Sequence, residues 1–419
     1  MNRLSALLAS AGLLLLGGCG LGSAEAGAQE KDQVYRLHYV VTIDREAGGA
    51  QVELTLRQRD GYLRELDMPL LDGRIGAVEG DGEVAIADGR AAWQPPADGG
   101  RLRWFARLEH QRGDGGYDAY LAADWALFRG EDVIPSARTR TVRGAFSRTS
   151  LELRLPPGWS SVTPWPGDGG RFEIDNPKRR FDTPTGWIVL GRLGVRNDTI
   201  AGIRTRIAGP VDHGVRRLDM LALLNWTLPE VLRVLPDFPE RLTVVSAGDP
   251  MWRGALSGPA SLYIHAERPL ISENGTSPLL HEVMHVGLGV GSEDGADWIV
   301  EGLAEYYGLE ALRRSGTISE QRYARALEGL AEWGREVDTL CARVSSGSRT
   351  ARAVTVFARL NAEIRQRTDG RHSLDDVLER IAERGRNVSV DALRDIATDV
   401  AGEPLDALGP RHLPGCDDG

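Results

Sequence analysis

Two short segments rich in histidine and glutamate constrain the fold of this chain more than any other feature. The first is His281-Glu282-Val283-Met284-His285, and the second is the stretch DWIVEGLAEYY over residues 297–307. Residues four apart on a helix share a face, so the two imidazoles of the first segment can reach one metal ion. The fold must therefore place a helix at residue 281 and bring the second segment back to it.

Glu301 is the candidate for a third metal ligand. Fifteen residues separate it from His285, which is enough for one helix to end, for the glycine-rich loop 287–295 to turn, and for a second helix to return. Zinc in hydrolytic sites usually has three protein ligands and a water molecule. His281, His285 and Glu301 therefore predict a site for one Zn²⁺ ion.

Glu282 and Glu305 have different expected roles. Glu282 follows the first histidine and can take a proton from water as a general base. Glu305 lies one turn after Glu301 on the same helix face, where it can hydrogen-bond a free histidine nitrogen and set its tautomer. The alternative is that both later glutamates are solvated helix charges and the histidines are surface or cap residues. The apolar neighbours of Glu301 and Glu305 favour a buried site, because buried carboxylates need partners.

The composition excludes some classes of function. The chain has 419 residues, with 50 basic and 60 acidic side chains. This slightly acidic balance gives no support to nucleic-acid binding, which usually shows a basic surface. The length allows two or three domains with their own cores. After the N-terminal region, no segment has the ~18 apolar residues that a membrane-spanning helix requires.

Residues 1–18 are predicted to be a lipoprotein signal peptide. Arg3 precedes an apolar run over residues 4–16, which is too short to span a membrane and is followed by Gly17-Gly18-Cys19. This ending resembles a bacterial lipobox, whose cysteine is lipidated. The alternative is an ordinary secretory signal with a coincidental cysteine. Gly20 is not the aspartate that tends to retain lipoproteins at the inner membrane. The expected location is therefore the cell envelope, with Cys19 anchored in the outer membrane and the chain facing the periplasm.

Two cysteines remain if Cys19 carries lipid. Cys341 and Cys416 belong to no CxxC or other metal-ligand pattern. In an oxidising compartment they can form one disulfide that ties the C-terminal tail to the helical body. The alternative is two unpaired thiols, and the sequence leaves both open.

The pattern of apolar residues predicts an α+β protein. A small, polar stretch over residues 19–33 is expected to be a flexible tether. Apolar residues then alternate from Val34 through a hairpin at Gly48-Gly49, and further short strands follow, which predicts an antiparallel β-sandwich over residues 34–208. Residues 209–405 are mainly helical, with strands expected at 242–245 and 261–265, and residues 406–419 form a tail.

The metal segments resemble a known family. HEVMH followed by WIVEGLAEYY resembles the gluzincin zinc peptidases, and specifically the bacterial glycyl aminopeptidase-like family, without a PDZ domain. The resemblance covers about residues 34–405 and is strongest over 279–380. It implies an N-terminal β-domain and a thermolysin-like, mainly helical catalytic domain with a small sheet. It also implies a zinc metallopeptidase that acts on peptides or proteins, with His281, His285 and Glu301 as ligands and Glu282 as general base.

Residues 261–265, just before the first metal segment, have two expected roles. In thermolysin-like folds an edge strand pairs with the extended backbone of the substrate. This strand can have that role, or it can be an ordinary strand of the sheet.

Two positions depart from the family pattern. Where related aminopeptidases have a tyrosine that stabilises the oxyanion, a gap-free alignment places Thr350. Where the family has a glutamate that resembles an amine-binding group, residues 253–257 read RGALS, with no carboxylate. Side chains elsewhere could compensate: Tyr306, Tyr307, Tyr323 or His372 for the tyrosine, and Glu267 or Glu273 for the glutamate. The departures leave a second function open, a catalytically impaired, peptidase-like envelope lipoprotein that acts as a binding or assembly factor.

Overall fold

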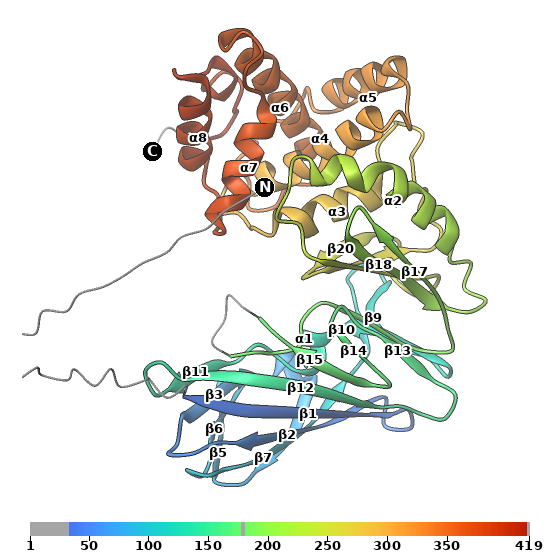
Figure 1. The fold of residues 1–419 in the computed structure, drawn as a ribbon, viewed down its shortest axis with the longest axis vertical. Coiled ribbons are helices and arrows are strands. Elements are labelled where there is room, and N and C mark those ends of the chain that lie inside the picture. The colour runs from blue at the N-terminus through green and yellow to red at the C-terminus, as the bar shows by residue number, and fades with distance from the viewer. Residues whose placement is uncertain (1–32, 177–180, 417–419) are drawn as a thin grey trace, which may run out of the picture.

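The computed structural model describes residues 33–176 and 181–416, which form two parts stacked along the long axis of the molecule. Strands make up the lower part in Figure 1 and helices the upper part, and a small sheet lies between them. The predicted signal peptide and Cys19 lie outside the described residues. Within the described ranges, no helix has both the length and the apolarity that a membrane crossing requires.

Three sheets build the lower part. The largest consists of β1 (Val34–Asp44), β2 (Gly49–Arg57), β4 (Ile75–Gly80), β7 (Gly99–Arg107), β12 (Phe146–Arg154), β14 (Gly167–Asp168) and β15 (Arg171–Ile174). A second sheet consists of β3 (Leu63–Pro69), β5 (Glu83–Ala87), β6 (Arg90–Gln94) and β11 (Arg138–Thr141). The third consists of β8 (His110–Gln111), β9 (Tyr117–Leu121), β10 (Trp125–Arg129), β13 (Ser160–Val162) and β16 (Trp187–Gly191). A short helix, α1 (Gly130–Val133), follows β10.

The predicted N-terminal hairpin is confirmed, but the sheet that contains it is mixed. β1 and β2 pair antiparallel with Ile43 opposite Ala50, and Leu37 and Tyr39 are buried in the core. The largest sheet has the order β14-β15-β12-β1-β2-β7-β4, and β1 pairs with β12 in parallel. The prediction of a purely antiparallel sandwich was therefore wrong. A parallel pair needs a long crossover, and the residues between β2 and β12 supply it.

A five-stranded sheet separates the lower part from the helices. It consists of β17 (Leu193–Ile200), β18 (Ile203–Pro210), β19 (Arg241–Ala247), β20 (Ala255–Gly258) and β21 (Ser261–His265), in the order β17-β18-β19-β21-β20. The alternating pattern predicts that the first two of these strands belong to an N-terminal domain that ends at residue 208. They belong instead to this sheet, because β18 pairs with β19 in parallel. Alternation identifies a strand but does not identify its partner.

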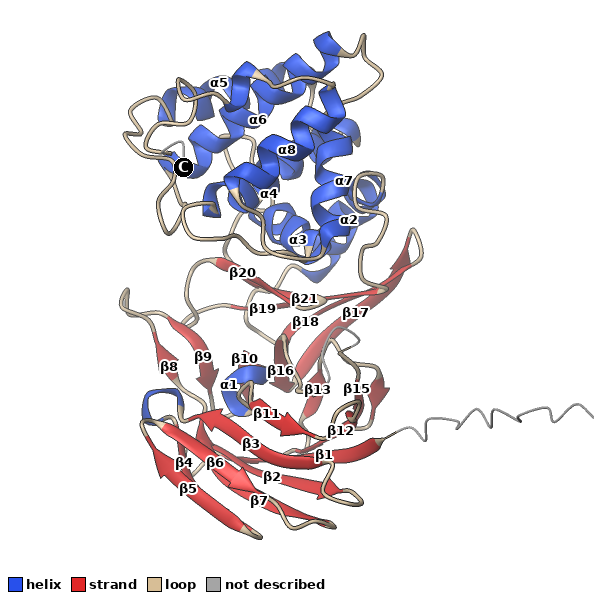
Figure 2. Cartoon of the chain, turned by 90° about the vertical axis from the view of Figure 1, so that its left-hand side faces the viewer, coloured by secondary structure: helices blue, strands red, loops and turns tan. Residues whose placement is uncertain are grey.

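Both faces of this sheet are covered. On one face, Val245 and Tyr263 join an apolar cluster with Trp125, Trp187 and Val189 of the third sheet. The rings of Trp187 and Tyr263 are 5.2 Å apart at their centroids. Figure 2 shows the helices on the opposite face of the sheet. A sheet buried on both sides gives the helices a rigid support.

The helical part consists of α2 (Arg217–Leu232), α3 (Pro278–Leu288), α4 (Asp297–Arg314), α5 (Glu320–Trp333), α6 (Ser348–Arg367), α7 (Leu374–Arg384) and α8 (Val390–Ala401). A 3₁₀ turn, η2 (Asp406–Leu408), follows them. Cys341, between α5 and α6, forms a disulfide with Cys416, with 5.0 Å between their Cα atoms. The C-terminal segment is therefore tied to the helical body.

The central helix, α4, packs closely against two neighbours through glycines. A Cβ atom built on Gly308 would lie 3.4 Å from the backbone nitrogen of His281 in α3. A Cβ atom on Gly302 would lie 2.5 Å from the Cβ atom of Ala353 in α6. A Cβ atom at position 302 would therefore clash with α6, whereas one at position 308 would be in ordinary van der Waals contact with α3.

We expect Gly302→Ala to destabilise the fold by about 1–3 kcal/mol, the usual cost of overpacking a core, measured by chemical denaturation. The matched control is Gly329→Ala in α5, where an added Cβ meets nothing within 4 Å. The control should be neutral or raise the unfolding free energy by up to about 1 kcal/mol, because alanine favours helices. Equal stability of Gly302→Ala and wild type would contradict the close contact.

Candidate metal centre

Local sequence signals define the helix that carries the two histidines. The Ser277 hydroxyl caps α3 by accepting a hydrogen bond from the backbone of Leu280, and Pro278 occupies the first turn. Gly289 ends the helix in a left-handed conformation that favours glycine. The apolar face of α3 packs in the core, while His281 and His285 each keep about one sixth of the side chain exposed, 16%. The helix thus presents both imidazoles to an accessible site.

The three predicted ligands come together in the structure. The Nε2 atoms of His281 and His285 are 3.1 Å apart. Nε2 of His281 is 3.3 Å from one carboxylate oxygen of Glu301, and Nε2 of His285 is 3.3 Å from the other. Around a tetrahedral zinc ion with bonds of about 2.0–2.1 Å, neighbouring ligand atoms are about 3.3–3.4 Å apart. The donor set therefore fits zinc, and within the described part of the chain it is the one cluster whose donor atoms could share a metal ion.

Glu305 orients one of the two histidines. Its carboxylate accepts a hydrogen bond from Nδ1 of His281 at 2.9 Å. With the proton on Nδ1, the Nε2 lone pair of His281 points to the site shared with His285 and Glu301. Glu301 and Glu305 are one turn apart on α4, so one helix supplies both a ligand and the group that orients another ligand.

The charges in the cluster favour a cation at its centre. Burial alone would raise the pKa of Glu301, but the hydrogen bonds from His281 and His285 outweigh it and lower the pKa to about 2. Burial alone would lower the pKa of His281, but its bonds to Glu301 and Glu305 outweigh it and raise the pKa well above the ordinary value. Two carboxylates thus stabilise positive charge between the rings, as a proton or as a metal ion.

Glu282 is buried beside the ligands. Glu282 is only 7% exposed. Burial raises the pKa of its carboxyl group, although the charges of His281 and His285 act to lower it. The backbone N–H of Ser257, in β20, donates a hydrogen bond to the Glu282 carboxylate. A carboxylate with a raised pKa is a better proton acceptor near neutral pH, as a general base requires.

Of the two roles expected for residues 261–265, the structure shows the ordinary strand of the sheet. β21 lies between β19 and β20, so residues 261–265 cannot be an edge strand. The edge strand is β20, which packs beside α3. β20 has four residues, Ala255 to Gly258, and this is too short for a periodic pattern to reveal. Ser257 was therefore missed as a residue that contacts the general base.

Each residue proposed to replace the missing tyrosine makes other contacts. The hydroxyl of Tyr306 accepts from Asn361 at 2.9 Å, and that of Tyr307 donates to Asp375 at 2.9 Å. Tyr323 donates to Glu310, and His372 bonds Asp376. Thr350 is buried, and its hydroxyl lies 3.3 Å from that of Ser345.

The two glutamates considered for amine binding also lie outside the cluster of metal ligands. Glu267 pairs with Arg253 at 2.9 Å, and Glu273 is exposed. None of the contacts described for the compensating residues joins them to the three ligands.

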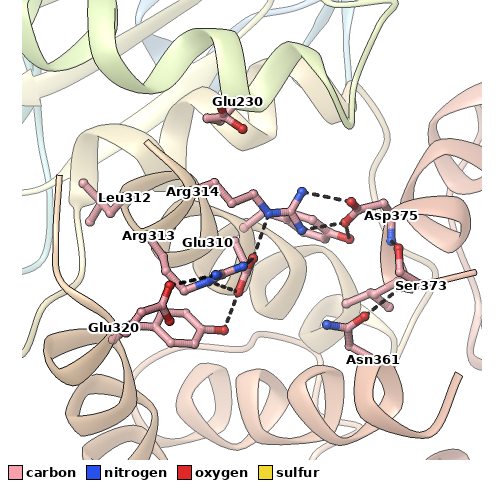
Figure 3. Close-up of polar contacts among 12 residues, drawn as sticks. Glu230, Glu310, Leu312, Arg313, Arg314, Glu320, Asn361, Ser373 and Asp375 are labelled. Atoms are coloured by element: carbon pink, nitrogen blue, oxygen red, sulfur yellow. Dashed lines mark hydrogen bonds and ion pairs between the residues drawn. The ribbon is translucent and has the colours of Figure 1, made fainter. Parts of the chain in front are cut away.

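An ionic network around the buried Glu310 holds the second half of α4 (Figure 3). Glu310 accepts hydrogen bonds from Arg313 at 2.9 Å and from Arg314 at 2.8 Å. Arg314 also forms a two-pronged pair with Asp375 of α7, at 2.8 and 2.9 Å. Arg313 reaches Glu320 of α5 at 3.0 Å. The network links α4 to α5 and α7 within about four turns of Glu301, and it fixes the helix that carries the third ligand.

Comparisons with known proteins agree with this geometry at the level of the fold. An aminopeptidase N family protein from Idiomarina loihiensis matches with a TM-score of 0.64 at 16% identity, over 91% of this chain and 74% of that one. An M1 zinc metallopeptidase from Deinococcus radiodurans matches with a TM-score of 0.55 at 16% identity, over 91% and 94% of the two chains. No protein-family model matches, and no curated protein is found as a relative.

A two-domain M1 zinc metallopeptidase bound to L-arginine has a TM-score of 0.53 at 18% identity, with 90% of this chain and 91% of that one covered. Such low identities establish a likeness of fold. The chain thus has the α+β fold seen in M1 zinc metallopeptidases, and it has three residues arranged for zinc within that fold.

We expect Glu305→Gln to raise the dissociation constant for zinc by about 10–100-fold, because the neutral amide oxygen accepts the Nδ1 proton of His281 more weakly than a carboxylate does. Competition with a chelator measures this constant. Glu328→Gln, an exposed substitution of the same kind on α5, should leave it unchanged. Equal zinc affinities of the Glu305 and Glu328 variants would contradict the role given to Glu305.

Proposed function

We propose that the protein is a zinc-dependent metallopeptidase that hydrolyses peptide bonds in the cell envelope. The observation that carries the proposal is the cluster of His281, His285 and Glu301. Its two Nε2 atoms are 3.1 Å apart, and each is 3.3 Å from a different oxygen of Glu301, separations close to those between the ligands of a tetrahedral zinc ion. The fold likeness to M1 zinc metallopeptidases supports it. The finer likeness to glycyl aminopeptidase-like, thermolysin-like enzymes rests on the HEVMH and WIVEGLAEYY motifs.

The proposed mechanism assigns a distinct task to each residue. His281, His285 and Glu301 would hold one zinc ion, and Glu305 would keep His281 in the tautomer that binds it. Bound zinc lowers the pKa of water toward neutrality and polarises a carbonyl group. Glu282 would take a proton from the attacking water at its carboxylate and pass that proton to the leaving amine.

The edge strand β20 offers a place for the substrate backbone. An extended peptide can add to the free edge of a sheet through backbone hydrogen bonds. β20 is such an edge, and its Ser257 already contacts the general base. A peptide laid along β20 would therefore pass close to Glu282.

The proposed location follows from the N-terminal sequence. Cys19 would carry lipid in the outer membrane, and the folded chain would face the periplasm, where peptides or proteins are its substrates. The disulfide between Cys341 and Cys416 is consistent with an oxidising compartment.

A second candidate is a peptidase-like binding or assembly factor without activity. Two observations favour it: Thr350 replaces the expected oxyanion tyrosine, and Tyr306, Tyr307 and Tyr323 bond elsewhere. Loss of one oxyanion donor typically costs about 2.7–4 kcal/mol of transition-state stabilisation. Such a factor would keep the zinc site and lack turnover.

We expect Glu282→Gln to lower kcat by about 10²–10⁴-fold on a broad peptide pool, because an amide cannot accept the proton. Zinc content, measured on the same samples, should stay at one ion per chain in both proteins. Cleavage that persists in Glu282→Gln would refute the role of Glu282. Zinc in the wild type with no cleavage of any peptide would refute the peptidase and favour the binding factor.

A further inference from the structure

Three arginines form a row on the outer face of the largest sheet. Arg36 of β1 lies directly opposite Arg57 of β2 on one side and Arg148 of β12 on the other. All three side chains are exposed. Like charges placed opposite each other on neighbouring strands destabilise a sheet. We call these residues the arginine row. An anionic partner would offset the repulsion between its three positive charges.

The same face of the sheet shows how other charges are compensated. Four residues along β1 from Arg36, the facing positions are acidic and paired. Glu53 bonds Arg103 at 2.7 Å, while Glu152 pairs with Arg154 at 2.9 Å and with Arg171 at 3.6 Å. In residues 33–176 and 181–416, by contrast, no hydrogen bond or ion pair of the guanidinium groups of the arginine row is found.

A cavity of about 1110 Å³ is lined by the arginine row, together with His38 and Ser150. Glu173 of β15, Asp175 just after it and the buried Asp182 also line the cavity, and no ion pair joins them to the arginine row. The positive charge of the row therefore faces open space and is available to an anionic partner from outside the chain.

The arginine row lies where the described chain begins. The carbonyl of Gln33 accepts a hydrogen bond from the backbone of Phe146, which fixes the start of β1 three residues before Arg36. Residues 20–33, fourteen in number, separate this point from Cys19. A chain of that length reaches at most about 50 Å when fully extended. A lipid at Cys19 would therefore keep this end of the sheet near the bilayer.

The protein is negatively charged as a whole, so the arginine row differs in charge from most of the surface. The formal net charge is −10, so an anionic membrane would repel most of the surface. We propose that Arg36, Arg57 and Arg148 form a docking surface for the anionic headgroups of the bilayer. Its orientation rests on the proposed anchor at Cys19.

The test uses residues 19–419 with Cys19→Ser, so that binding does not depend on lipid. Co-sedimentation measures its partition onto vesicles of phosphatidylcholine alone and of phosphatidylcholine mixed with phosphatidylglycerol. We expect binding to the mixed vesicles only, weakened by salt. The triple substitution Arg36→Gln, Arg57→Gln and Arg148→Gln should reduce the partition coefficient on the order of a hundredfold, about fivefold for each arginine near the surface.

The matched control is Arg103→Gln, Arg154→Gln and Arg171→Gln, which removes the same charge from the same face. These arginines lie roughly 13–20 Å along the strands from the row, beyond the Debye length of about 8 Å. The decrease in the partition coefficient should be less than one tenth as large in the control as in the variant that lacks the arginine row. Equal losses in both variants, equal binding to neutral vesicles, or binding of inorganic phosphate without binding of vesicles would overturn the proposal. All of these outcomes measure binding, so they do not depend on whether the protein is a peptidase.

Discussion

The candidate metal centre depends on the close approach of α3 and α4. Gly308 lets the backbones of the two helices come together beside His281. One turn earlier on α4, Glu305 reaches the Nδ1 atom of the same histidine, and Glu301 lies between the two Nε2 atoms. A Cβ atom at position 308 would already be in van der Waals contact with α3. A side chain longer than that of alanine would therefore push the helices apart, and with them the ligand atoms that now lie 3.1–3.3 Å from one another.

The remaining structure holds that contact in place from several sides. The small sheet packs against α3 through β20 and β21, and α6 contacts α4 at Gly302. The network around Glu310 and Arg314 fixes the later turns of α4 against α5 and α7. Ligands held by rigid, packed elements lose little freedom when a metal binds, so such a site is prepared for its ion in advance. The proposed catalysis depends on this preparation, because Glu282 is useful only where water is held beside it.

Much of the site could be predicted because its signals are local. The spacing of His281 and His285 indicates one helix face, and a return helix at Glu301 follows from the length of the glycine loop. What could not be predicted depends on pairing between distant segments. No local pattern shows that β1 pairs with β12 in parallel, that β18 joins β19, or that β20 rather than β21 is the edge strand. The contact of Ser257 with Glu282 and the hydrogen bond from Tyr307 to Asp375 also join residues that are distant in the sequence.

We propose that two imidazoles and one carboxylate bind a single zinc ion and leave a position for water. X-ray absorption at the zinc edge of the zinc-loaded protein measures this coordination. We expect two imidazole nitrogens at about 2.0–2.1 Å, with oxygen ligands at about 2.0–2.2 Å from Glu301 and water. Zinc that shows no imidazole scattering, or a coordination shell that contains sulfur, would contradict it.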